Sequence, residues 1–156
     1  MHIRLLAVGD RQPSWVEDAF GIYCRRFPRE WKFRVDIIPA VRRGKNDKSH
    51  QALAAEGDQI LSKLGAKEQV VLLDERGRQL TSKSLAARLS DWQSDARDLC
   101  FVIGGPDGLS PEVLAEASMK LSLSDLTFPH TLAKVMLVEQ LYRAWTILKN
   151  HPYHRA

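Results

Sequence analysis

The chain has 156 residues, of which 44% are hydrophobic and 27% charged, a composition typical of one globular domain and incompatible with wholesale disorder. The formal net charge is +4, well short of a histone-like tail. The positive charge lies in the first third: residues 1–50 carry eleven basic and six acidic side chains, whereas residues 51–156 carry twelve and thirteen. We therefore expect a polyanionic partner to meet the first third of the chain.

The sequence predicts a protein of the cytoplasm, outside any membrane. Two cysteines, Cys24 and Cys100, lie in apolar segments, which indicates a reducing compartment rather than a disulfide framework. The apolar run after Met1 is too short for a signal peptide. The most apolar stretch, residues 132–148, holds four strongly polar side chains that a membrane span would not carry.

The first half of the chain predicts strands and helices in alternation. Residues 3–8 form an apolar run typical of a buried strand. Ser14 and Glu17 have the spacing of a capping box, so a helix is expected from Ser14 to Pro28. Apolar and polar side chains alternate over residues 31–37, which predicts a half-exposed strand. A polar loop at 42–48 precedes a second helix that ends near Gly65.

The second half continues the alternation. Strands are expected at 70–73, 99–103 and 121–123, with residues 74–77 as a turn. Helices are expected at 84–95, from the Ser110–Pro111 cap to about 119, and at 131–150. The predicted class is therefore α/β, with a mostly parallel sheet of five or six strands covered by helices on both faces.

Ligands of such sheets bind at the carboxyl ends of the strands, where three loops stand out: those after Leu73 and Ile103, and residues 124–130. The loop after Ile103 reads Gly-Gly-Pro-Asp-Gly. Its glycines either let the backbone approach a ligand or simply form a tight turn, and the motif alone leaves both open. The spacing is not that of a dinucleotide fingerprint, and no P-loop motif occurs.

The C-terminal segment has two interpretations. Tyr153 and His154 carry rings that stack on RNA bases, and Arg155 can bind phosphate or carbonyl oxygens, but the segment could equally be a frayed terminus. His151 and His154 stand three apart, yet a metal ion normally needs four ligands, so no metal site is expected. No GxSxG motif supports Ser/His/Asp hydrolysis.

Seven basic side chains near the amino terminus are candidate phosphate contacts, with a merely solvated surface as the alternative. They are Arg25, Arg26, Arg29, Arg42, Arg43, Lys45 and Lys48. The final predicted helix is apolar on nearly its whole circumference, which requires burial all round. A subunit interface would provide that burial, so we expect a homodimer built on this helix.

Four motifs together resemble one known family, and the resemblance covers the whole chain. They are Ile103-Gly104-Gly105-Pro106-Asp107-Gly108, residues 123–130, Glu139-Gln140-Leu141-Tyr142-Arg143-Ala144-Trp145 and Asn150-His151-Pro152-Tyr153-His154-Arg155. The chain resembles the RlmH family, ribosomal RNA large-subunit methyltransferases of the SPOUT class. The paired IGGPxG and NHPYHR motifs are highly specific together.

The resemblance implies one SPOUT domain over residues 1–156, with a deep trefoil knot at about 70–156 that the general rule against knots would exclude. It also implies S-adenosylmethionine bound in the knot. The implied binding positions are Leu73, Gly104, Leu123, Ser124, Asp125, Leu126, Thr127 and Phe128. The side chain of Asp125 is expected to be incidental, with the loop backbone holding the adenine.

The implied substrate is a pseudouridine of 23S rRNA, at position 1915 in helix 69 of the assembled ribosome, methylated at N3. Arg155 is the candidate for stabilising the N3 anion, with His154 or Tyr153 positioning the base. The resemblance leaves the general base open. The candidate RNA contacts are Arg25, Arg26, Arg42, Arg43 and Lys45.

Two other functions compete with this interpretation. A non-catalytic ribosome-binding module would use the same basic residues, but it needs neither the Gly104–Gly105 loop nor the apolar segment around it. A different SPOUT methyltransferase acting on tRNA would keep that loop, but the C-terminal motif matches only the RlmH family.

Overall fold

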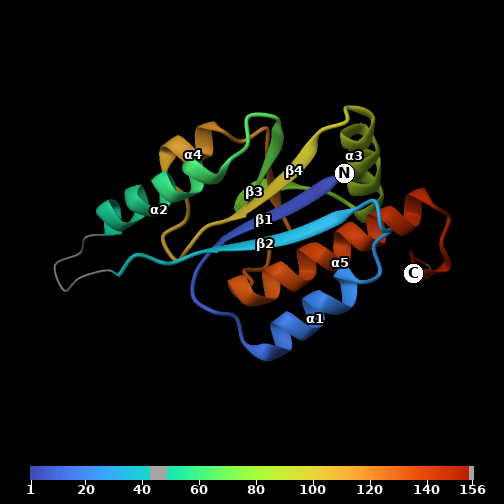
Figure 1. Cartoon of the computed structure of the whole chain (residues 1–156), viewed down its shortest axis with the longest axis horizontal. Coiled ribbons are helices and arrows are strands. Elements are labelled where there is room, and N and C mark those ends of the chain that lie inside the picture. The colour runs from blue at the N-terminus through green and yellow to red at the C-terminus, as the bar shows by residue number, and fades with distance from the viewer. Residues whose placement is uncertain (43–48, 155–156) are drawn as a thin grey trace.

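The computed structural model describes residues 1–42 and 49–154. Its described strands form one parallel sheet in the order β2-β1-β4-β3-β5, as Figure 1 shows. The strands are β1 (His2–Val8), β2 (Lys32–Ile38), β3 (Glu68–Gln79), β4 (Asp98–Ile103) and β5 (Met119–Ser122). The predicted α/β class with a parallel sheet is confirmed.

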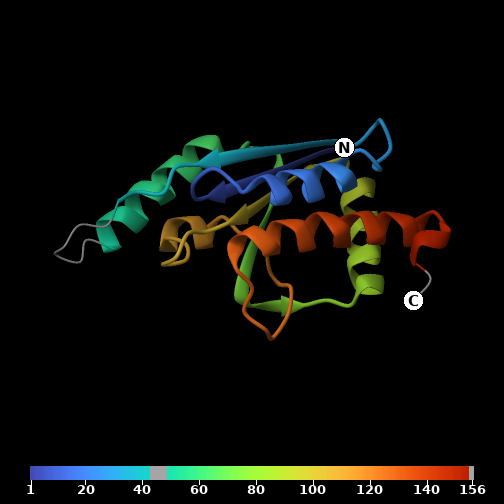
Figure 2. The same ribbon diagram turned by 90° about the horizontal axis from the view of Figure 1, so that it is seen from below.

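Helices cover both faces of the sheet (Figures 1 and 2). On one face lie α1 (Ser14–Cys24), α3 (Ser82–Ser94) and α5 (His130–Leu148), and on the other lie α2 (Ser49–Lys63) and α4 (Pro111–Ala115). A short 3₁₀ turn, η1 (Pro152–His154), follows α5. Because β4 is covered on both sides, residues 99–103 are all buried, which explains their continuous apolar run.

The predicted capping box on α1 is wrong. The N-cap position falls on Pro13, which has no side-chain oxygen, so Ser14 lies inside the helix and caps nothing. The helix also ends at Cys24, short of Pro28. The cap predicted at Ser110 is confirmed, since its hydroxyl accepts a hydrogen bond from the N–H of Val113.

Helix α4 ends at Ala115 rather than near residue 119 because the chain has already joined the sheet. The backbone N–H and the hydroxyl of Ser118 both donate to the carbonyl of Val70, at 2.9 and 2.6 Å. This pairing directs the chain into β5, which a helix continuing to 119 would prevent.

The turn predicted at residues 74–77 is part of strand β3. Both Leu73 and Arg78 pair with Leu121 of β5, so the residues between them form a bulge in a continuing strand. Gly77 passes so close to β5 that a Cβ there would lie 2.7 Å from the backbone of Lys120 and Leu121. The polar residues 74–77 therefore mark an irregular strand, not its end.

Helix α5 is covered mainly within its own chain. It packs against the sheet and lies between α1 and α3, and residues 131–148 are all buried or half-buried. Its apolar circumference thus has a partner without a second subunit. The large apolar side chains left exposed include Trp15 and Ile22 on α1, and Leu126. The homodimer stays a prediction, now supported by those side chains.

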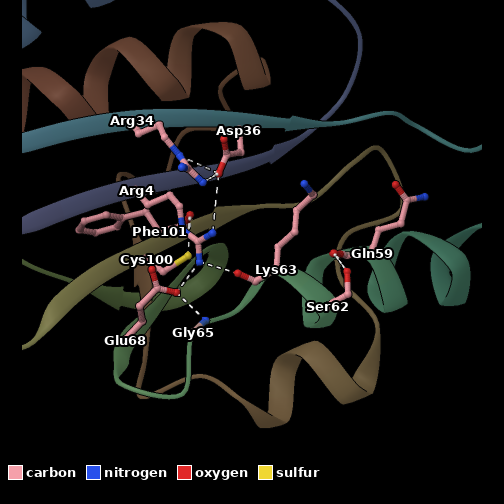
Figure 3. Close-up of polar contacts among 10 residues, drawn as sticks. All are labelled: Arg4, Arg34, Asp36, Gln59, Ser62, Lys63, Gly65, Glu68, Cys100 and Phe101. Atoms are coloured by element: carbon pink, nitrogen blue, oxygen red, sulfur yellow. Dashed lines mark hydrogen bonds and ion pairs between the residues drawn. The ribbon is translucent and has the colours of Figure 1, made fainter.

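Arginine 4 joins four elements at the amino ends of the strands, as Figure 3 shows. Its guanidinium bonds to the carboxylate of Glu68 and donates to the carbonyl of Lys63 at 2.6 Å, and it lies 3.7 Å from Asp36. Glu68 also accepts from the N–H of Gly65 at 2.8 Å. We call Arg4, Asp36, Glu68 and the Lys63 carbonyl the Arg4 cluster, and its contacts hold the end of α2 on the sheet.

Candidate active site

A cavity of about 550 Å³ opens at the carboxyl ends of β3, β4 and β5. This volume is typical of a small-molecule site, for which roughly 300–1,000 Å³ is usual. All three segments singled out by the sequence line it, although the one after Leu73 is the bulge of β3 rather than a loop. Seven of the eight predicted cofactor positions line it: Leu73, Gly104, Leu123, Ser124, Leu126, Thr127 and Phe128.

The glycine loop folds tightly onto itself. The N–H of Gly108 donates to the carbonyl of Gly105 at 3.0 Å, and Gly108 has a φ of +82°. A Cβ on Gly104 would lie 2.5 Å from the carbonyl oxygen of Gly108. Gly104 is thus required by the loop's own backbone, so the tight turn is confirmed. The loop also lines the cavity, and a close approach of its backbone to a ligand stays a prediction.

Serine hydroxyls fix the loop after β5. The hydroxyl of Ser122 donates to the carbonyl of Ser124 at 3.0 Å, and the hydroxyl of Ser124 accepts from the N–H of Leu126 at 3.0 Å. The carboxylate of Asp125 accepts from the amide of Gln79 at 2.5 Å, which ties the loop to the end of β3. Asp125 is the one predicted cofactor position off the cavity wall, and its side chain has this structural partner instead.

The first turn of α5 contributes the imidazole of His130, a residue that the sequence predicts only as the end of a loop. His130 lines the cavity, and Lys134, one turn further, is only 3% exposed. Burial lowers the pKa of Lys134. Partial desolvation and the charge of Lys134 lower the pKa of His130, which favours the neutral form of the imidazole at the cavity wall. The signal in the sequence was its position directly after Pro129, at a helix start.

The C-terminal segment lies at the other end of α5 from the cavity. The hydroxyl of Tyr153 donates to the carboxylate of Glu139 at 3.0 Å. The Tyr153 hydroxyl reaches Glu139, which lies nine residues, or about 14 Å, along α5 from His130 at the cavity. Neither Tyr153 nor His154 lines the cavity of its own chain. Figure 1 shows this separation along the helix. Arg155 lies outside the described residues.

The predicted RNA contacts fall into two groups. Arg25 and Arg26 follow α1, at the end of the molecule that holds η1, whereas Arg42 follows β2, at the cavity end. Arg26 is exposed, and its guanidinium also lies within 6.0 Å of the centroids of three tyrosine rings. Arg43 and Lys45 lie outside the described residues.

Within residues 1–42 and 49–154, no three His, Cys, Asp or Glu side chains come together as a metal-binding group. No helix in the described part of the chain is long and apolar enough to cross a membrane.

A parallel sheet with a cavity formed by loops at the carboxyl ends of its strands defines a class of enzyme-like folds. The family described as "Predicted SPOUT methyltransferase" matches residues 1–154, and the chain belongs to this family. A crystal structure of a methylase family protein from Neisseria gonorrhoeae has the same fold. It gives a TM-score of 0.56 at 13% identity, covering 90% of this chain and 81% of the other.

Proteins named Ribosomal RNA large subunit methyltransferase H are much closer in sequence. Those from Saccharophagus degradans and Thioalkalivibrio sulfidiphilus are each 46% identical over 155 residues, and that from Pseudomonas fluorescens is 44% identical. Each match covers 99% of this chain and at least 99% of the relative. The resemblance to the RlmH family is confirmed.

Proposed function

We propose that the chain is an S-adenosylmethionine-dependent methyltransferase that methylates N3 of the pseudouridine at position 1915 in helix 69 of 23S rRNA. It acts in the cytoplasm, on the assembled ribosome. The observation that carries the proposal is full-length similarity to proteins named Ribosomal RNA large subunit methyltransferase H, joined to a cavity at the edge of the sheet where ligands of this fold bind.

The residues of the cavity suit S-adenosylmethionine. Leu73, Leu121 and Leu114 offer apolar contact for an adenine ring, and the loop at 123–128 offers backbone N–H and C=O groups for its nitrogens. The glycine loop adds further backbone groups to the cavity wall. The ligand supplies an electrophilic methyl group when bound, and we assign Leu73, Gly104 and residues 123–128 to holding it.

The protein's part in the chemistry is alignment and stabilisation of an anion. N3–H of the base lies between two carbonyl groups, so a cation on one of these oxygens favours loss of the N3 proton. Arg155 is our candidate for that cation, and His154 for positioning the base. The planar guanidinium group of Arg155 suits a carbonyl oxygen flanked by other acceptors better than the ammonium group of a lysine would.

Two copies of the chain are needed for this assignment. In one chain Tyr153 is held at Glu139 and neither it nor His154 lines the cavity, which supports a second copy as the source of the residues that contact the base. We therefore propose a homodimer in which the C-terminal segment of one protomer faces the cavity of its partner. The exposed side chains of Trp15, Ile22 and Leu126 are candidates for the interface. The trefoil knot over residues 70–156 and the single-domain organisation remain part of this proposal.

Methyl transfer from labelled S-adenosylmethionine tests the proposal. The protein is incubated with assembled ribosomes that lack the modification, with isolated large subunits, with naked 23S rRNA and with tRNA. We expect label in ribosomal RNA from assembled ribosomes, at helix 69 by mass spectrometry of the isolated fragment. Label in tRNA would instead assign a different SPOUT activity, and ribosome binding without label would assign a binding module.

A further inference from the structure

Two guanidinium groups lie within cation–π distance of the Tyr153 ring. Arg26, just after α1, lies 5.9 Å from the ring centroid, and Arg143, on α5, lies 5.2 Å from it. Both distances are within the range of a cation–π contact. The ring also meets Tyr142 edge-on, with centroids 4.8 Å apart. The half-buried tyrosine ring therefore has three contacts within its own chain, with Arg26, Arg143 and Tyr142.

The hydroxyl of Tyr153 meets an acceptor that is itself held in place. Glu139 Oε1 accepts from Tyr153 at 3.0 Å and from two guanidinium nitrogens of Arg143 at 3.0 and 2.6 Å. Glu139 Oε2 accepts from the amide of Gln140 at 2.7 Å, and Gln140 in turn accepts from the hydroxyl of Ser82 on α3 at 2.7 Å. The carboxylate thus has a fixed orientation before the phenol binds it.

The backbone after α5 is shaped to return Tyr153 to this acceptor. Asn150 has a φ of 51°, the left-handed conformation that ends many helices. The N–H of His151 donates to the carbonyl of Thr146, and that of Asn150 to Ile147, the bonding pattern of a Schellman motif. The chain therefore turns back along α5 directly before η1.

We infer that Glu139 is a positioning residue that fixes the C-terminal segment through Tyr153. We call Glu139, Arg143, Arg26 and Tyr153 the Tyr153 anchor. Its consequence for catalysis rests on the proposed function: Tyr153 does not stack on the base, as one sequence interpretation had it, because its ring and hydroxyl are both engaged within the chain. His154 and the residues after it would reach the substrate from this fixed point.

Two simpler explanations make different predictions. If Glu139 were only one half of an ion pair on α5, its neutralisation would leave the C-terminal segment unchanged, because such pairs contribute little. If Tyr153 stacked on the base, Tyr153→Phe would remain active because phenylalanine keeps the ring. The anchor requires both the carboxylate and the hydroxyl.

The first test measures how well the C-terminal segment is held. Four proteins are digested with carboxypeptidase Y and followed by intact-mass spectrometry: wild type, Glu139→Gln, Tyr153→Phe and, as a control, Glu112→Gln, which changes an exposed side chain of α4. We expect digestion of wild type and the control to slow before residue 153 is released. Release of residue 153 should be at least fivefold faster in both anchor variants.

The second test measures the catalytic consequence on the same proteins. In single-turnover methylation of ribosomes, Glu139→Gln and Tyr153→Phe should each be at least about tenfold slower than wild type, with S-adenosylmethionine affinity unchanged. The double variant should be no slower than the slower single variant, because both changes remove one interaction. A merely structural role would not produce this pattern at unchanged cofactor affinity.

The outcomes separate the two proposals. Release of residue 153 within twofold of wild type in both variants would overturn the anchor, as would slow methylation with an unchanged digestion rate. If wild type methylates no ribosomal RNA but the digestion difference is present, the proposed function fails and the anchor is supported. If Glu139→Gln does not fold, the test of the anchor rests on Tyr153→Phe, which removes the hydroxyl and keeps the ring contacts.

Discussion

Two arginine–carboxylate clusters lie at the same end of this molecule, on opposite faces of the sheet, and they do different work. In the Arg4 cluster, Arg4 joins Glu68, Asp36 and the end of α2, which are 32 to 64 positions away in the sequence. In the Tyr153 anchor, Glu139 and Arg143 are one turn apart on a single helix and bind the last described residues of the chain. The Arg4 cluster joins β1, β2, β3 and α2 to one another. The Tyr153 anchor instead attaches the C-terminal segment to α5.

We expect substitutions C-terminal to Tyr153 to lower the rate of methyl transfer without changing the stability of the fold. Arg155→Ala should slow single-turnover methylation of ribosomes by roughly 10²–10³-fold, as loss of one charge-assisted contact to a transition state does. The melting temperature and S-adenosylmethionine affinity should not change. Arg155→Lys should restore little activity, because a point charge does not replace the planar fork. A rate within threefold of wild type for Arg155→Ala would remove the residue from the active site.

The Arg4 cluster should show the opposite behaviour. Arg4 is 15% exposed, and its removal leaves Glu68 and the Lys63 carbonyl without their partner. Arg4→Ala should therefore lower the free energy of unfolding by about 2–3 kcal/mol, somewhat below the cost typical of a fully buried pair. Arg34→Ala is the matched control, since Arg34 contacts the same Asp36 but is 68% exposed, and it should cost less than about 1 kcal/mol. Urea unfolding measures both, and equal losses would contradict this account.

A change in the glycine loop should separate the cavity from both clusters. A side chain at Gly104 meets the backbone of Gly108, so Gly104→Val must displace the loop. We expect S-adenosylmethionine affinity to fall at least about tenfold, roughly 1.4 kcal/mol, by calorimetry. Gly105→Ala is the milder control, because its Cβ would be nearest to a Val8 side-chain atom at 3.2 Å. Carboxypeptidase digestion of Gly104→Val should match wild type, and faster release of residue 153 would show that the two ends are coupled.

The smallest expected effect is a pH dependence of the anchor. Burial, then the hydrogen bonds with Tyr23 and Glu139, raise the pKa of Tyr153 above its usual value of about 10. A raised pKa means that the unfolded chain releases the proton first, so the stabilisation is complete below about pH 10 and is lost as the pH rises above it. The stability difference between wild type and Tyr153→Phe should thus shrink as the pH rises from about 10 to 11.5. A difference that stays constant over this range would contradict the shift.

Local patterns predicted much of the fold and of the cavity. The apolar run at 99–103 identified β4, and the rule that ligands bind at the carboxyl ends of parallel strands selected the three loops that form the cavity wall. The wrong predictions also came from local sequence patterns. Ser14 and Glu17 have the spacing of a capping box, but the backbone placed Pro13 at the N-cap, and polar residues 74–77 read as a turn although β3 pairs on both sides of them.

What the sequence determined by itself was therefore the alternation of elements, the class of fold, the ligand-binding loops and, by its motifs, the family. Only the tertiary structure showed that α5 is covered by α1 and α3, that Arg4 reaches Glu68, and that Tyr153 returns to Glu139. Periodicity reports which face of an element is apolar, because neighbouring side chains on a helix or strand share a face. It carries no information on which distant element will cover that face, and the partner of a charged group follows from chain packing rather than from spacing.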